Sequence, residues 1–133
     1  MTRQSLLRPI LVGIGLMLST VVAAQEPIDN CSSLLGSLSV ELRYARKLSP
    51  DARTTFVCPR DTKALLGANK QRIVNSLGPP DITGAADHEG SSASWSYFFG
   101  PRPEATYPPG VPELRFAFDG QQKVTTVSCQ RTR

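Results

Sequence analysis

The chain has little of what metal-dependent and hydrolytic catalysis requires. Its 133 residues include a single histidine, His88, and no Cys-x-x-Cys pair. One imidazole cannot complete a multi-histidine metal site, and it is the only imidazole that could serve a serine or cysteine nucleophile as its base. Three consecutive residues on a loop do not converge on one ion, so we interpret Asp87-His88-Glu89 as an exposed polar string. The missing Cys-x-x-Cys removes the signature of a thioredoxin-like redox site.

Sequence motifs for hydrolysis and for phosphate binding are missing as well, and so is a basic block for nucleic-acid binding. The chain contains no Gly-x-Ser-x-Gly, no His-Glu-x-x-His and no phosphate-binding glycine-rich loop,. Its lysines and arginines form no basic block, which disfavours nucleic-acid binding,. We therefore predict a protein that is not an enzyme, with no catalytic residue, no cofactor and no bound metal. The expected partner is another protein and not a nucleic acid.

The first 24 residues have the organisation of a secretory signal peptide. Arg3 and Arg8 precede an apolar run from Pro9 to Leu18, and small residues follow up to Ala24,. The run is shorter than the roughly 20 residues that span a bilayer. We therefore expect cleavage after Ala24 and export from the cytoplasm, which makes the mature chain a periplasmic or secreted protein.

The leader does not match a lipoprotein signal. The first cysteine, Cys31, follows Ile28-Asp29-Asn30, which are neither small nor apolar. No direct lipid anchor is therefore predicted. Loss of the leader removes two arginines and no acid, so the net charge falls from +4 to +2. Residues 25–133 are expected to form one compact unit.

Three cysteines, Cys31, Cys58 and Cys129, follow the leader. In an oxidising compartment they allow one disulfide with one remaining thiol, or an intermolecular disulfide. Closing the 58–129 loop is worth about 4.4 kcal/mol and the 31–58 loop about 3.6 kcal/mol in the chain-entropy account. The energies do not choose between these pairings, and both stay open on this basis.

Apolar spacing predicts helices in the first half of the mature chain. Apolar residues recur every three or four positions from 29 to 48, and Ser49-Pro50 ends this helix,. Cys31 lies on its apolar side, as a buried, inert thiol would. A helical turn is expected over 62–66. A further helix is expected to begin after Asn69 and to end at Gly78, ahead of two prolines,.

The second half of the chain predicts strands. The segment 94–99 alternates, with Trp95, Tyr97 and Phe99 on one face, and the segments 114–118 and 123–129 also read as strands,. Residues 81–92 are predicted to form a polar loop. The expected fold is α+β, a two-layer sandwich of helices on a three-stranded antiparallel meander with an extra N-terminal helix.

A family resemblance covers about residues 61–129. The stretch 66–81, LGANKQRIVNSLGPPD, resembles the G-x-[ST/N]-x-x-x-V-x-x-x-L-G-x-P core of the SmpA/OmlA family, and the Trp95-Ser96-Tyr97 and Leu114–Asp119 segments match its later strands. The family includes the smallest, E-labelled component of the outer-membrane β-barrel assembly machine. The chain resembles a non-lipidated member of this family. The resemblance implies a SmpA/OmlA-like domain over 61–133, after a helix and connecting segment over 25–60.

The resemblance also has implications for disulfide pairing and partners. In such a fold Val127 and Cys129 face the helices near Cys58, which implies a Cys58–Cys129 disulfide with Cys31 free; Cys31–Cys58 is the rival. The same two-helix, three-strand fold resembles the repeat unit of secreted β-lactamase inhibitor proteins. Both relatives bind other proteins, and the first implies contact with an outer-membrane protein.

The proline-rich loop 100–112 is the candidate binding element. Its prolines reduce the entropy lost on binding, so Arg102, Glu104 and Tyr107 are the partner-binding candidates,. The competing interpretation is a stiff connection that protects a sheet edge. The leading functional hypothesis is a non-enzymatic periplasmic protein-binding module, associated with the cell envelope. The alternatives are an inhibitor that uses this loop and a hydrolase or small-ligand carrier, which would require a concave pocket.

Overall fold

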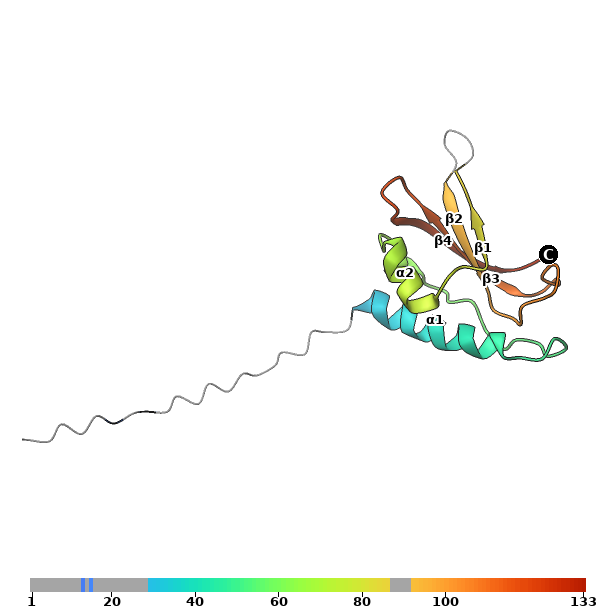
Figure 1. Cartoon of the computed structure of the whole chain (residues 1–133), viewed down its shortest axis with the longest axis horizontal. Coiled ribbons are helices and arrows are strands. Elements are labelled where there is room, and N and C mark those ends of the chain that lie inside the picture. Colours follow the sequence, from blue (N-terminus) through green and yellow to red (C-terminus); the bar gives the residue numbers. More distant parts are fainter. Residues whose placement is uncertain (1–12, 14, 16–28, 87–91) are drawn as a thin grey trace, which may run out of the picture.

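The computed structural model describes Gly13, Gly15 and the ranges 29–86 and 92–133. The remainder of the predicted signal peptide and His88 lie outside the described residues. The elements are α1 (Asn30–Arg46), the 3₁₀ turn η1 (Lys63–Leu65), α2 (Lys70–Leu77), β1 (Ile82–Gly84), β2 (Ala93–Phe98), β3 (Pro112–Phe118) and β4 (Val124–Arg131). Both helices lie along one face of the sheet (Figure 1). The predicted α+β class is confirmed.

In the described part of the chain the sheet has four strands, not the three that the sequence predicts. It is an antiparallel meander in the order β1-β2-β3-β4. The additional strand, β1, lies in the segment 81–92 that was predicted to be a loop. Ile82 pairs with Ser96, and the Asp81 N–H donates to the Ser96 carbonyl at 2.9 Å. Three residues are too few to show an alternating pattern, and both Ile82 and Thr83 are exposed.

Helix α1 begins at a side-chain cap and buries one apolar face. The Asp29 carboxylate accepts the Ser32 N–H at 2.6 Å, which satisfies an N–H of the first turn,. The buried residues of this helix are Cys31, Leu35, Leu38, Leu42 and Ala45. They recur every three or four positions, so they share the face that packs on the sheet.

Helix α2 has the predicted start and end. Asn69 Oδ1 accepts the Arg72 N–H at 2.8 Å. Gly78 follows the last residue with φ of 76° and ψ of −171°, a conformation open mainly to glycine,. Ile73 and Leu77 are buried against the sheet. The helix is thereby confined to eight residues.

Aromatic side chains fill the space between helices and sheet. Tyr97 and Phe116 meet edge to face at 5.9 Å, and Phe56 stacks on Phe99 at 3.8 Å. The Tyr97 hydroxyl donates to the Gly78 carbonyl at 2.8 Å, and burial raises the pKa of this phenol well above its ordinary range. Trp95 is partly buried and packs against the core, as its alternating position predicts. The hydroxyl of Tyr97 therefore links the central strand to the end of α2.

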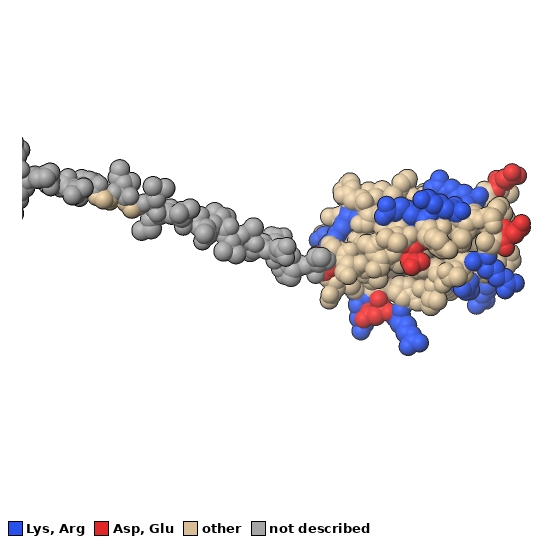
Figure 2. Space-filling model, turned by 90° about the horizontal axis from the view of Figure 1, so that it is seen from below, with Lys and Arg blue, Asp and Glu red and all other residues tan. Residues whose placement is uncertain are grey.

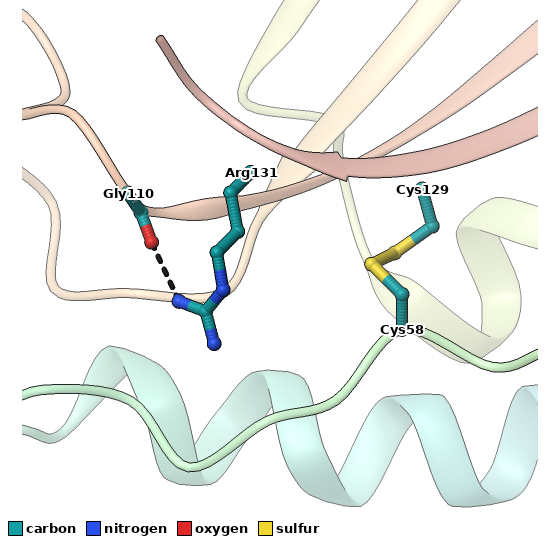
Figure 3. Close-up of a disulfide and its surroundings, with 4 residues drawn as sticks. All are labelled: Cys58, Gly110, Cys129 and Arg131. Atoms are coloured by element: carbon teal, nitrogen blue, oxygen red, sulfur yellow. Dashed lines mark hydrogen bonds between the residues drawn. A yellow bond between two sulfur atoms is a disulfide. The ribbon is translucent and has the colours of Figure 1, made fainter.

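A disulfide joins Cys58 to Cys129 in β4, with the two Cα atoms 5.6 Å apart (Figure 3). Cys31 is free and buried. The pairing implied by the family resemblance is confirmed, and the rival Cys31–Cys58 pairing is wrong. Val127 and Cys129 both pack against the core from β4. None of the helices in the described part of the chain is long and apolar enough to cross a membrane.

Candidate functional site

The proline-rich loop is held at its base by backbone hydrogen bonds. The Phe99 N–H donates to the Pro112 carbonyl at 2.9 Å, which closes the loop between β2 and β3. The end of β4 holds its second half: the Gly110 N–H donates to the Thr132 carbonyl at 2.9 Å, and the Thr132 hydroxyl donates to the Pro108 carbonyl at 2.9 Å. The exposed tip is therefore carried on a fixed base.

Tyr107 anchors this loop to the sheet. Its ring stacks on Phe98 with centroids 4.0 Å apart and an angle of 14° between the planes. Burial, and secondarily the charge of Asp81, raises the pKa of the Tyr107 phenol. One ring face is thus already used within the protein. As a partner-binding residue Tyr107 offers only its remaining surface.

A cleft of about 1240 Å³ lies between this loop and the segment 50–54. Arg102 and Glu104 line the cleft, whereas Tyr107 does not. The cleft is also lined by three charged residues that the sequence did not indicate as site residues, Asp51, Arg53 and Arg131. Prolines form much of the remaining lining: Pro50, Pro101, Pro103, Pro108 and Pro109.

The three arginines of the cleft differ in the hydrogen bonds and ion pairs that they form within the protein. Arg131 Nη1 donates to the Gly110 carbonyl at 2.7 Å (Figure 3), which leaves its other donors available,. Arg102 Nε lies 3.5 Å from Asp81 Oδ1, and its side chain is 62% exposed. Arg53 is exposed and makes no hydrogen bond or ion pair with another described residue. The cleft therefore presents guanidinium groups to whatever enters it.

Asp81 links the proline-rich loop to the rest of the fold. Its side chain is 4% exposed and accepts Arg46 Nη2 at 3.0 Å and the Phe98 N–H at 2.8 Å. The same carboxylate is the ion-pair partner of Arg102. One buried carboxylate thus connects α1, the start of β1, the end of β2 and the proline-rich loop.

The chemical groups of the cleft suit binding. Its described lining supplies guanidinium groups, carboxylates and prolines, together with the hydroxyls of Thr54 and Thr106. Among the described residues, no group of three or more His, Cys, Asp or Glu side chains could hold a metal ion. Viewed from below, Lys and Arg side chains occur in separate places with Asp and Glu between them (Figure 2). This face therefore carries charges of both signs and no extended patch of a single sign.

Sequence patterns identify one wall of the cleft and miss the other. Arg102 and Glu104 stand in a conspicuous proline-rich stretch, whereas Asp51 and Arg53 stand in a short segment after Pro50 with no motif of its own. Only the tertiary fold brings the two walls together. Comparisons with protein-family models, with curated proteins and with solved structures find no match to this chain.

Proposed function

We propose that this protein is a non-enzymatic, periplasmic protein-binding module associated with the cell envelope, and that the cleft beside the proline-rich loop receives its partner. The observation that carries the proposal is the convergence of Arg102, Arg53 and Arg131 on one cleft with a fixed base. Arginine is among the residue types that contribute most to binding energy in protein interfaces.

The construction of the cleft supports a protein partner. A prolyl loop with both ends held loses little conformational entropy on binding. The cleft is larger than the roughly 300–1,000 Å³ typical of small-molecule sites. Its exposed arginines flank Asp51 and Glu104, so a partner meets charges of both signs at fixed positions.

The envelope location rests on the leader and on the family resemblance. The signal peptide predicted over residues 1–24 directs export. The Leu66–Asp81 motif resembles that of the SmpA/OmlA family, which includes the E-labelled component of the outer-membrane β-barrel assembly machine. An outer-membrane protein is the partner that this resemblance favours.

Affinity capture from an envelope extract tests the proposal. The bait is residues 25–133, compared with the double variant Arg53→Ala/Glu104→Ala, which removes one base and one acid from opposite walls of the cleft. The matched control is Glu41→Ala/Lys47→Ala, which removes the same charges from exposed positions on and just after α1. We expect the partner's affinity to fall about tenfold or more in the cleft variant, as for central interface residues, and to stay unchanged in the control. Equal retention by both variants would refute the cleft as the binding site.

An inhibitor that inserts this loop into an enzyme is the second candidate, favoured by the exposed tip with Arg102 and Glu104. The two modes use different walls. A partner that enters the cleft depends on Arg53, whereas an enzyme that receives the loop does not. Arg53→Ala alone therefore distinguishes them: weakened binding indicates the cleft, and unchanged binding together with a loss in Arg102→Ala/Glu104→Ala indicates loop insertion.

A hydrolase or small-ligand carrier is the third candidate, and the concave pocket that it requires is present in the cleft. Native mass spectrometry of the protein purified from the periplasm separates this candidate from the others. A bound small molecule retained by the native protein and lost from Arg53→Ala/Glu104→Ala would favour a carrier over a protein-binding module.

A further inference from the structure

Strand β4 forms one edge of the sheet. Its inner side pairs with β3 from Pro112↔Arg131 to Phe118↔Val124, with a bulge between Ala117 and Phe118. The opposite side of β4 has no neighbouring strand among the described residues. The backbone groups on that outer side decide whether it can accept one.

The hydrogen bonds at the end of β4 show which groups face outward. The Thr132 N–H donates to the Val111 carbonyl at 2.8 Å, so the backbone polar groups of Thr132 face inward. Backbone direction alternates along an extended strand. The N–H and C=O groups of Arg131, Cys129 and Val127 therefore face away from β3.

Described residues bond to the outer edge only where β4 begins. There the Val124 N–H donates to the Ala68 carbonyl, and Val124 accepts the Gly67 N–H, both at 2.8 Å. Beyond the bulge, no backbone hydrogen bond joins the outward groups to another described residue. Exposed side chains flank them: Thr125, Thr126, Ser128 and Gln130.

The disulfide does not cover this edge. The Cys129 side chain packs with the core, and the segment that carries Cys58 passes below β4, on the side of α1 (Figure 3). The bridge therefore occupies the helix side of the strand and leaves the plane of the sheet free.

The usual protections of an edge strand are missing here. Between Thr125 and Gln130 the strand has no lysine, no proline and no inward-pointing charge. Natural edges commonly carry such residues because unpaired backbone groups template pairing with another chain. The bulge at Ala117/Phe118 lies at the start of β4 and leaves its later residues regular.

Charge decides what could pair with this edge. From Gly120 to the last residue the chain has three basic residues, Lys123, Arg131 and Arg133, and no acid. A second copy added antiparallel about Val127 would set Arg131 beside Lys123 of the other copy, and other registers still bring together two segments of the same sign. Like charges opposite each other destabilise a strand pair. An acidic segment would instead be attracted.

We propose that the outer edge of β4 accepts an extended, acidic segment of another polypeptide as a fifth strand. The segment bonds to the backbone of Val127, Cys129 and Arg131, and its acidic side chains pair with Arg131 and Arg133. Arg131 also lines the cleft, so a segment that follows β4 to its end reaches the candidate binding site. The inference rests on the proposed function in that the partner is a protein, and it specifies the form and charge of that partner.

Amide hydrogen exchange followed by NMR tests this proposal on residues 25–133. In the free protein we expect the amides of Thr126, Ser128 and Gln130 to be protected and those of Val127, Cys129 and Arg131 to exchange freely. The probe is a six-residue peptide that alternates glutamate and valine. We expect it to slow exchange at the three outward amides by about tenfold or more, and a matched lysine–valine peptide to have no effect.

A proline variant gives an independent check. Val127→Pro removes one outward N–H and no inward one, so it should abolish the effect of the acidic peptide, whereas Ser128→Ala should preserve it. If Val127→Pro does not fold, exchange in the unsubstituted protein decides the question.

Two results would overturn the inference. One is outward amides that remain fast at millimolar acidic peptide. The other is outward amides already protected in the free protein at a level that rises with its concentration, which would identify a second copy as the occupant. If the outward amides do not respond while Arg53→Ala/Glu104→Ala still loses a captured partner, this inference fails and the proposed function stands. If that variant captures the partner as well as the unsubstituted protein does, and the outward amides are protected by the acidic peptide, the cleft proposal fails and this inference stands.

Discussion

The Asp81 carboxylate lies 3.0 Å from Nη2 of Arg46, and this pair joins the last turn of α1 to the start of the sheet. The carboxylate is 4% exposed and also accepts the Phe98 N–H. Arg46 Nε is buried without a hydrogen-bond partner in the described part of the protein, so the guanidinium depends on Asp81 for compensation of its charge. Arg102 of the proline-rich loop lies against the same carboxylate.

Replacing Asp81 by alanine should therefore destabilise the protein by about 2–4 kcal/mol, because it leaves a mostly buried guanidinium and a backbone N–H unpaired. Urea unfolding followed by circular dichroism measures this loss. The exposed Asp51→Ala is the control and should change the free energy of unfolding by no more than about 0.5 kcal/mol. Equal stability of the two variants would contradict a structural role for the pair.

The disulfide should contribute strongly to the stability of the protein. Its cysteines are 71 residues apart. In the chain-entropy account, Cys58→Ser/Cys129→Ser should lower the free energy of unfolding by about 4 kcal/mol. Cys31→Ala should cost much less, because Cys31 forms no bridge. Thiol titration offers a second check: one thiol should react only after unfolding, and a rapidly reacting thiol in the native protein would contradict the burial of Cys31.

Stability should fall in acid partly through Asp29. Hydrogen bonds from Arg72, then from the Ser32 backbone and side chain, lower the pKa of Asp29 from 3.8 to about 2. A lowered pKa in the folded state stabilises the protein at pH values above 3.8, and this contribution disappears as the pH falls toward 2,. Asp29→Asn should therefore flatten the loss of stability over that interval.

NMR titration of the Asp29 carboxyl measures the same effect directly. Arg72→Met should return the pKa of Asp29 toward 3.8, because it removes the largest cause of the shift. An unchanged pKa in that variant would show that the helix cap alone lowers it.

Two glycine-to-alanine substitutions should change the stability of the protein in opposite directions. Gly36 is an exposed helical residue with open space around its Cβ position, so Gly36→Ala should stabilise α1 by up to about 1 kcal/mol,. Gly78 also has open space but has a φ of +76°, so Gly78→Ala should destabilise by about 1–3 kcal/mol through backbone strain alone,. Thermal unfolding of both variants checks the pair, and a stabilising Gly78→Ala would contradict the conformation at the end of α2.

The sequence predicts those parts of the fold that depend on residues close together in the chain. Asn69 and Gly78 mark α2 correctly because capping and positive φ are properties of single residues. The strand β1 was missed because it forms by pairing with residues 94–96 of β2, and its own three residues show no strand pattern. Arg53 and Arg131 were missed for the same reason: no spacing pattern places segment 50–54 opposite residue 131. Tyr107 was found as a polar aromatic, but its stacking on Phe98 required the folded loop.

Site-specific photocrosslinking in cells that express the full chain tests the central claim most directly. A photoreactive amino acid is placed at Ala105, at Ala52 on the opposite wall of the cleft, and at the exposed Gln71 of α2 as the control. We predict that Ala105 and Ala52 crosslink to the same envelope protein and that Gln71 does not. Crosslinks of equal strength from Gln71, or none from either wall of the cleft, would contradict a protein-binding role for the cleft.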